Sequence, residues 1–185
     1  MKALHLGCGQ RFIPGYIHID LADYPHIDYR HDVKTLPMFE DSTIDLIYAS
    51  HVIEYFDRVE VMDVLKEWRR VLKKGGILRL AVPDFEAMVR VYDEYKDLSL
   101  IHGPLYGRYE IEGTKKIIYH KTVYDFSSLK AVLEKSKFRN IKRWDWRKIF
   151  SGEYEGYDDY SQAYVPHLDK EKGILISLNV ECEKT

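Results

Sequence analysis

The sequence predicts an α/β fold built around a mostly parallel sheet. Through the first half of the chain, short apolar runs alternate with turn residues or helical patterns, which is the signature of βαβ units. Residues 44–50 are nearly continuous in apolar character, as expected of a strand covered on both faces, whereas residues 174–182 alternate like an antiparallel strand. A chain of 185 residues suits one domain with a sizeable core, so we predict a single domain over 1–185.

The predicted strands of the first half follow one another closely. Residues 3–6, 16–21, 27–30 and 44–50 form these strands, the third being the weakest pattern. Parallel neighbours normally need a crossover of about a dozen residues or more, usually a helix. Only residues 10–15 separate the first two strands, and Pro14-Gly15 disfavours a helix there. We therefore predict that the first crossover helix is absent or reduced to a turn.

The predicted helices and the last strands follow the strand at 44–50. Residues 58–73 have apolar side chains at helical spacing, and Gly75-Gly76 should end that helix. Residues 77–82 form a strand, after which Asp84 can cap a helix. The inward stripe of that helix is expected at Phe85, Met88, Val89, Tyr92 and Tyr95. Residues 98–120 lack a clear period and predict an ordered loop or lid, followed by a helix at 127–136 and strands at 139–146 and 174–182.

Composition narrows the classes of function. The net charge of −2 gives no electrostatic signature of nucleic-acid binding, so no nucleic-acid partner is expected. No apolar run approaches the length of a membrane span or a signal peptide, which predicts a cytoplasmic protein without membrane insertion. Cys8 and Cys182 lie near opposite ends of the chain, in no disulfide or metal-ligand pattern. These features do not decide whether the chain forms a homo-oligomer.

Three ligand-facing positions follow the first three strands. Gly7-Cys8-Gly9 permits a tight turn whose backbone N–H groups approach a ligand, and Asp20 can accept both hydroxyls of a ribose. Asp32 follows the third strand, and together these positions match the crevice in which open α/β sheets bind nucleosides. Each carboxylate is also compatible with a solvated loop or a cap. A dinucleotide site is disfavoured, because Phe12 stands where a third glycine is needed and Asp20 comes too early.

These blocks resemble class I S-adenosylmethionine-dependent methyltransferases, particularly a small subgroup that begins LNLGCG. The resemblance rests on LHLGCG (4–9), HIDL (18–21), the run 31–56, VLKKGG (71–76) and LRLAVPD (78–84), and covers about the first 85 residues. It implies a Rossmann-like methyltransferase fold, with a mostly parallel seven-stranded sheet and an antiparallel last strand. Residues 1–85 would then be the cofactor-binding half and 86–185 the substrate-side half, with a lid at 98–120.

The resemblance also implies a set of residues that bind S-adenosylmethionine. The glycine turn would hold the methionine part, Asp20 the ribose, Asp32 and Val33 the adenine, and Ser50 and His51 the sulfonium end. The expected cofactor-binding residues are Gly7, Cys8, Gly9, Asp20, Leu21, Asp32, Val33, Ser50 and His51. His5 departs from the family, which often has an acidic residue there. With the short crossover, this suggests that residues 98–120, residues 154–167 or a partner subunit cover the amino-acid end of the cofactor.

Methyl transfer to a hydroxyl benefits from a positioned base. His51, Asp84 and His120 follow predicted strands or the lid and are the candidate catalytic residues, although His51 also suits packing and Asp84 a helix cap. His51 and Glu54 have a spacing compatible with a metal, but one pair is too few ligands, so no metal is predicted. We expect methyl transfer to a small-molecule or glycan acceptor, with a hydroxyl favoured. The alternative is a cofactor-binding subunit with weak or no turnover that acts as a partner or scaffold.

Overall fold

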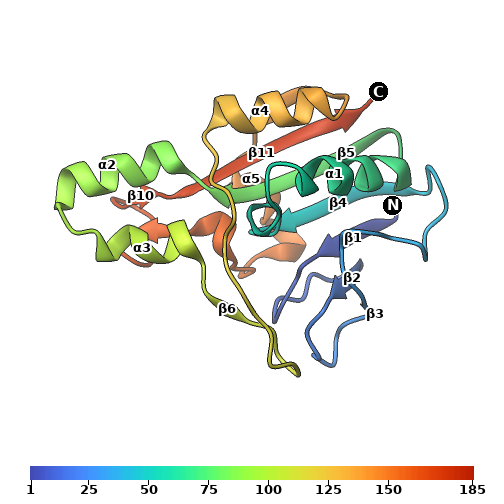
Figure 1. Cartoon of the computed structure of the whole chain (residues 1–185), viewed down its shortest axis with the longest axis horizontal. Coiled ribbons are helices and arrows are strands. Elements are labelled where there is room, and N and C mark those ends of the chain that lie inside the picture. The colour runs from blue at the N-terminus through green and yellow to red at the C-terminus, as the bar shows by residue number, and fades with distance from the viewer.

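The computed structural model describes residues 1–185 and contains a seven-stranded sheet in the order β3-β2-β1-β4-β5-β11-β8 (Figure 1). The first five strands are parallel, and β11 pairs antiparallel with both β5 and β8. The predicted Rossmann-like sheet with its antiparallel last strand is therefore confirmed. The strands are β1 (Ala3–Leu6), β2 (Tyr16–Asp20), β3 (Tyr29–Arg30), β4 (Ile44–Ser50), β5 (Leu72–Pro83), β8 (Phe138–Arg143) and β11 (Ser177–Lys184).

Helices cover one face of this sheet and extend beyond its carboxyl edge. The helices are α1 (Glu60–Val71), α2 (Phe85–Tyr95), α3 (Ser99–Tyr106), α4 (Phe126–Lys135), α5 (Trp146–Ile149) and the 3-10 turns η1 (Ile53–Tyr55), η2 (Gly152–Tyr154) and η3 (Tyr160–Gln162). Residues of α1 and α4 share the largest core cluster with inward residues of β1, β4 and β5. In Figure 1, α2 and α3 lie past the carboxyl end of β5, away from both chain termini. No helix is both long and apolar enough to cross a membrane.

The connection from β1 to β2 contains no helix, as predicted. Irregular segments cover the sheet face that a crossover helix would normally cover. Ile13 of this connection packs with Tyr48 and Ala81 from the sheet, and with Trp144 and Phe150 from the segment after β8. The indole N–H of Trp144 donates to the Leu80 carbonyl at 2.9 Å. Aromatic side chains from the second half therefore bury the face that the shortened first half leaves open.

The end of α1 differs from the prediction. The helix stops at Val71, and Leu72 is already extended (φ −64°, ψ 139°) and paired with Ile44 of β4. Gly75 and Gly76 lie inside β5 rather than beyond a helix C-terminus, and Gly75 has a φ of +77°. Leu72 is fully buried, so its burial in the sheet competes successfully with one further helical turn.

The inward face of α2 also differs from the predicted stripe. Its buried residues are Ala87, Met88 and Val91, whereas Phe85, Val89, Tyr92 and Tyr95 are 40–51% exposed. The buried three pack against Ile101, Val165 and Ile176, from α3 and from the strands near the C-terminus. The buried face therefore differs from the one that periodicity suggested, because hydrophobicity alone does not distinguish the two faces of this helix.

The segment predicted as a loop or lid contains regular structure. It holds α3 and the hairpin of β6 (Tyr109–Glu110) with β7 (Ile117–Ile118). The helix escaped the sequence pattern because it has only eight residues and contains Pro104, which removes one backbone donor. The last predicted strand is divided into β10 (Ile174–Leu175), paired with β9 (Tyr164–Val165), and β11. Strand β8 ends at Arg143, since Asp145 caps α5 by accepting from the Arg147 N–H at 3.0 Å.

Candidate functional site

The site begins at the carboxyl edge of the sheet, where β1, β2 and β4 end side by side. The Gly7 N–H donates to the Ile19 carbonyl at 2.8 Å, and the Gly9 N–H donates to Asp20 Oδ2 at 2.8 Å. The other carboxylate oxygen, Oδ1, accepts from the Ala22 N–H at 2.7 Å. Asp20 is only 9% exposed, so this carboxylate fixes the turn after β1 relative to the end of β2.

The glycine turn is tightly enclosed. Gly7 and Gly9 have φ values of +62° and +52°, in the left-handed region that favours glycine. A β-carbon on Gly7 would stand 2.5 Å from Val52 Cγ2, and one on Gly9 would stand 3.6 Å from the Tyr109 hydroxyl. The turn therefore lies between the segment that follows β4 and the β6–β7 hairpin. Val52 fills the space in front of Gly7, whereas a β-carbon on Gly9 would make only an ordinary contact with the Tyr109 hydroxyl.

Cys8 and His5 are both neutral at this edge. The Cys8 thiol is buried and lies 4.0 Å from the Ile19 carbonyl, and burial raises the pKa of that thiol. His5 packs 5.5 Å from the ring of His18 and 5.3 Å from that of Tyr48, and its burial lowers the imidazole pKa well below its ordinary value. At this edge the His5 imidazole is therefore uncharged, and the Cys8 side chain is a thiol rather than a thiolate.

The residues predicted to frame a nucleobase follow β2 and β3. Asp32 Oδ1 accepts from the Lys34 N–H at 3.0 Å, leaving its other oxygen outside that turn. Val33 is buried, and its carbonyl accepts from the Trp68 indole N–H of α1 at 2.7 Å. Leu21 is half-buried, and its carbonyl accepts from Arg30 Nε at 3.1 Å. Val33 and Leu21 are thus held by neighbouring elements, whereas Asp32 is held within its own turn.

Ser50 and His51 end β4 and leave polar atoms without partners. The Ser50 Oγ and His51 Nε2 atoms are buried and make no hydrogen bond within the chain. His51 has a φ of +56°, which is uncommon for a residue with a side chain and is concentrated at functional sites. Its N–H donates to the Ala81 carbonyl at 2.8 Å, so pairing with β5 holds this strained position.

Beside His51 the structure places a carboxyl group that the sequence interpretation did not choose as a site residue. Glu54 of η1 is fully buried, and neither carboxyl oxygen has a hydrogen-bond partner. Its Oε1 lies 3.3 Å from His51 Nδ1 and 3.8 Å from His120 Nε2. Burial raises the pKa of Glu54 to about 8 and lowers that of His51 to about 3. A glutamate inside the apolar run VIEYF was the available signal.

His120 is brought to this cluster from the far side of the β6–β7 hairpin. Its Nδ1 lies 2.9 Å from the Pro104 carbonyl, and its ring packs 4.8 Å from that of Tyr55. A β-carbon on Gly107 would stand 2.0 Å from Nε2, so only glycine admits this imidazole. Burial lowers the pKa of His120. The candidate bases His51 and His120, predicted separately, therefore both approach the same carboxyl oxygen of Glu54.

Asp84, the third candidate base, has a structural role at the start of α2. Its Oδ1 accepts from the Glu86 and Ala87 N–H groups at 3.1 and 3.4 Å. Its Oδ2 lies 3.6 Å from Arg143 Nη1. These contacts cap the helix and pair the carboxylate with Arg143 of β8 rather than with His51, Glu54 or His120.

Two later segments lie near the residues expected to bind the cofactor. The Asp23 N–H donates to the Glu112 carbonyl of the β6–β7 hairpin at 3.2 Å, and Tyr109 of the hairpin faces Gly9. The segment 154–167 places the Tyr160 ring 5.2 Å from that of His51. Its Asp159 Oδ2 accepts from the hydroxyls of Tyr48 at 2.5 Å and Tyr157 at 3.0 Å, which anchors the segment to the sheet.

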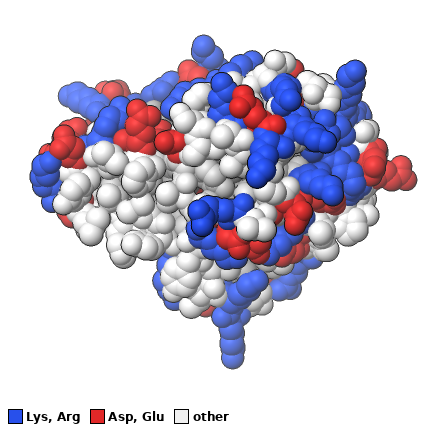
Figure 2. Space-filling view, turned by 45° about the horizontal axis from the view of Figure 1, so that its top comes forward, with Lys and Arg blue, Asp and Glu red and all other residues white.

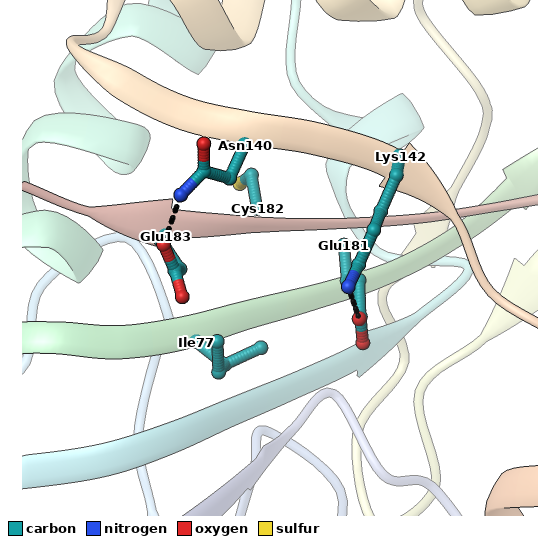
Figure 3. A pocket seen from close by; sticks show the side chains of 6 residues that line it. All are labelled: Ile77, Asn140, Lys142, Glu181, Cys182 and Glu183. Carbon is teal, nitrogen blue, oxygen red and sulfur yellow. Dashed lines mark hydrogen bonds and ion pairs between the residues drawn. The ribbon is translucent and has the colours of Figure 1, made fainter.

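A shallow groove on the sheet lies elsewhere. Figure 3 shows its lining residues on β5, β8 and β11: Ile77, Asn140, Lys142, Glu181, Cys182 and Glu183. Lys142 Nζ pairs with Glu181 Oε1 at 3.3 Å, and Asn140 donates to Glu183. Ile77 lies toward the amino end of β5, whereas the glycine turn and Glu54 follow carboxyl ends of strands. The groove is therefore separate from the candidate site. No group of three or more His, Cys, Asp or Glu side chains has a metal-holding arrangement.

Known proteins resemble this chain in sequence and fold. Residues 4–80 match the family described as "Methyltransferase domain". An uncharacterized protein of Methanocaldococcus jannaschii is 33% identical over 92 residues, which cover 49% of this chain and 39% of that protein. The chain thus spans well under half the length of this curated relative.

Solved structures share the fold at low identity. A S-adenosylmethionine-dependent methyltransferase from Archaeoglobus fulgidus has a TM-score of 0.58 and 16% identity, with coverage of 99% of this chain and 86% of that one. A Burkholderia thailandensis 1,6-didemethyltoxoflavin-N1-methyltransferase, solved with its substrate and S-adenosylhomocysteine, has a TM-score of 0.57 and 13% identity, covering 99% and 70%. The chain has the class I methyltransferase fold.

Proposed function

We propose that this chain, whose residues 4–80 carry a methyltransferase domain, binds S-adenosylmethionine and transfers its methyl group to a small-molecule or glycan acceptor. The observation that carries the proposal is the arrangement at the sheet edge. A glycine turn held by Asp20 lies beside Ser50 and His51, whose buried polar atoms have no partner within the chain. Unsatisfied buried polar atoms are unfavourable, so a polar ligand would stabilise this edge.

The residues present fit the donor. A β-carbon on Gly9 would meet only the Tyr109 hydroxyl, at 3.6 Å, so a ligand can approach the backbone closely at Gly9, whereas Val52 fills the space in front of Gly7. Each oxygen of Asp20 accepts one backbone hydrogen bond and keeps capacity for another, as binding ribose hydroxyls requires. Asp32 and Val33 would frame the adenine. When bound, the donor supplies an activated methyl group on a sulfonium.

The chain's own contribution to transfer is alignment and exclusion of water. An in-line displacement on an activated donor gains most from holding the acceptor close and correctly oriented. The β6–β7 hairpin reaches the turn after β2, and Tyr160 packs on His51, so both ends of the candidate site are covered by later segments. The contact of the hairpin supports the proposed lid function of residues 98–120.

The acceptor is proposed to be a small molecule or a glycan and to react through a hydroxyl. On the face shown in Figure 2, Lys and Arg interleave with Asp and Glu instead of forming one cationic surface, which argues against a nucleic-acid acceptor. The buried carboxyl group of Glu54 can take a proton, which suits a hydroxyl acceptor. Segment 154–167 gives less support to a glycan, because Gln162 bonds to the Tyr157 carbonyl at 2.8 Å and to Lys170 at 2.7 Å.

A second candidate is a subunit that binds the donor but turns it over weakly or not at all. The neutral His5 and the missing crossover helix favour it, because they reduce the support around the amino-acid end of the donor. Release of S-adenosylhomocysteine, measured against a panel of sugars, nucleotide sugars and phenols, separates the two. Release with one acceptor class supports the enzyme, and donor binding without release across the panel supports the alternative. Failure to bind the donor overturns both.

A further inference from the structure

We propose that Glu54 is the proton acceptor of the methyl-acceptor site, with His51 and His120 as the flanking groups that orient the acceptor. The inference rests on the proposed function and assigns to it a catalytic residue that the sequence patterns did not indicate. It is drawn from the position, burial and unsatisfied state of the Glu54 carboxyl group.

The carboxyl of Glu54 is not explained by the packing of the fold. Its side chain has no exposed surface, yet neither oxygen is hydrogen-bonded. An unpaired buried polar group destabilises a protein by roughly 1–3 kcal/mol, more if charged. An apolar side chain of similar volume would avoid this loss. The backbone of Glu54, not its side chain, holds the turn in place: its carbonyl accepts from the Lys121 and Thr122 N–H groups at 2.8 and 3.2 Å.

Its location is at the place where transfer would occur. Residues 51–54 follow β4, and Val52 of this turn touches the space in front of Gly7. Ser50 Oγ and His51 Nε2 are the neighbouring atoms without partners. A donor seated on the glycine turn would therefore face the same turn of chain that carries Glu54, and an acceptor entering beside it would meet Glu54, His51 and His120 together.

The surroundings of Glu54 contain no permanent cation. His51 and His120 face it, and burial lowers the pKa of both, so neither is charged near neutral pH. The other titratable neighbours are tyrosines, Tyr55 from η1 and Tyr124 from the segment before α4. Glu60 is the contrast within the chain, since Lys34 at 2.9 Å and Lys121 at 2.7 Å hold its pKa at about 2.

This environment makes the ionisation of Glu54 depend on the donor. A buried carboxyl without a cation holds its proton, and an opposite charge brought within about 4–6 Å lowers a carboxyl pKa by about 1–3 units. The positive sulfonium of a bound donor is such a charge. Binding of the donor would thus release the proton from Glu54 and leave a carboxylate ready to act as a base near neutral pH.

The step balances. The acceptor oxygen forms a bond to the methyl carbon as its proton moves to the Glu54 carboxylate, and the carbon–sulfur bond breaks with its electron pair left on sulfur. The products are the methylated acceptor, a protonated Glu54 and a neutral thioether. The carboxylate charge and the sulfonium charge disappear together, so the buried site ends uncharged, which is favourable in surroundings of low polarity.

The experiment compares the affinities of S-adenosylmethionine and S-adenosylhomocysteine by calorimetry at about pH 6.5 and about pH 9, on either side of the raised pKa of Glu54. The two probes share their amino-acid, ribose and adenine groups and differ in the charged sulfonium. The ratio of the two affinities should favour the sulfonium by about tenfold more at the higher pH in the wild type. In Glu54→Gln the ratio should change less than about twofold, and the matched control Glu94→Gln, on the exposed side of α2, should behave like the wild type.

A ratio that does not change with pH in the wild type, or that changes equally in Glu54→Gln, would overturn the assignment while leaving donor binding, and so the proposed function, intact. Absence of binding by both probes would overturn the proposed function itself. With an acceptor identified from the panel, Glu54→Gln should lower kcat by about 100-fold or more and raise KM for the donor by a smaller factor of about tenfold, and Glu54→Asp should restore part of the turnover.

Discussion

The side chain of Val52 occupies the space that a β-carbon on Gly7 would fill, with Cγ2 only 2.5 Å from that position. This contact joins the turn after β1 to the turn after β4. The first turn is expected to hold the donor and the second carries Glu54, so the two parts of the candidate site are fitted to each other across one close approach.

Gly7→Ala should therefore destabilise the protein and disturb the site. The φ of +62° adds strain, and the new methyl group must also displace Val52. We expect a loss of about 2–4 kcal/mol in the free energy of unfolding, measured in urea. Gly15→Ala is the matched control, because Gly15 has a φ of +80° but nothing within 4 Å of its β-carbon position. If both variants lose the same free energy of unfolding, the contact with Val52 does not contribute to the cost of the substitution at Gly7.

Gly107→Ala tests how His120 is positioned. A β-carbon there would stand 2.0 Å from His120 Nε2, so the imidazole must leave its place beside Glu54. Turnover should fall by at least about tenfold while donor affinity is nearly kept, because residue 107 does not touch the glycine turn. Gly103→Ala lies in the same helical segment with open space around it and should be neutral or slightly stabilising. Full activity in Gly107→Ala would exclude a role for His120.

Stability should depend on pH through Glu54. Its pKa rises from 4.5 to about 8 on folding, so between these values the folded state holds a proton that the unfolded state has lost. The contribution of Glu54 to the free energy of unfolding therefore falls as pH rises from about 4.5 to about 8. Glu54→Gln should become more stable than the wild type across this window by an amount on the order of 2–5 kcal/mol.

Chemical unfolding of both proteins at several pH values measures this difference. Glu94→Gln, an exposed position, serves as the control and should stay parallel to the wild type. A constant difference between Glu54→Gln and the wild type from pH 4.5 to pH 8 would mean that Glu54 is solvated and ionised like an ordinary surface carboxylate.

Trp68→Phe should weaken the predicted adenine end of the site from the helix side. Trp68 is fully buried in α1, and its indole N–H donates to the Val33 carbonyl at 2.7 Å. Loss of this bond and of packing volume should lower stability by about 2–4 kcal/mol and reduce the affinities for the donor and its demethylated product equally. The control is Trp146 of α5, whose indole N–H donates to the Tyr164 hydroxyl at 3.3 Å. Trp146→Phe should leave both affinities unchanged. A selective loss for one ligand would contradict the placement of Val33.

The sheet was predictable because its strands are marked locally. The sequence predicts a strand at 44–50, and β4 has the same bounds. A continuous apolar run between turns is compatible with few other structures. Pro14 and Gly15 likewise predicted the missing crossover helix from chain geometry alone. The ends of helices and strands that depend on tertiary pairing could not be predicted from the local sequence. Leu72 leaves α1 because it pairs with Ile44, and nothing near Leu72 in the sequence indicates that partner.

Some residues of the candidate site could likewise be predicted from the sequence, and others could not. Asp20 and the glycine turn follow strands directly, so the order of the strands placed them together. Glu54 and His120 are 66 residues apart and meet only because the β6–β7 hairpin returns the chain to η1. A charged residue in an apolar run was visible at Glu54, but its burial without a partner is a property of the folded chain.

Calorimetric titration of Asp20→Ala with S-adenosylmethionine tests the central claim most directly. The wild type should bind, and the variant should bind about 100-fold more weakly or not detectably, because it loses both the ribose acceptor and the bond that holds the Gly9 N–H. Asp63→Ala, on the exposed side of α1, should bind like the wild type. Equal affinity of Asp20→Ala and the wild type would contradict the account, because the donor would then not lie at the carboxyl edge of β1 and β2.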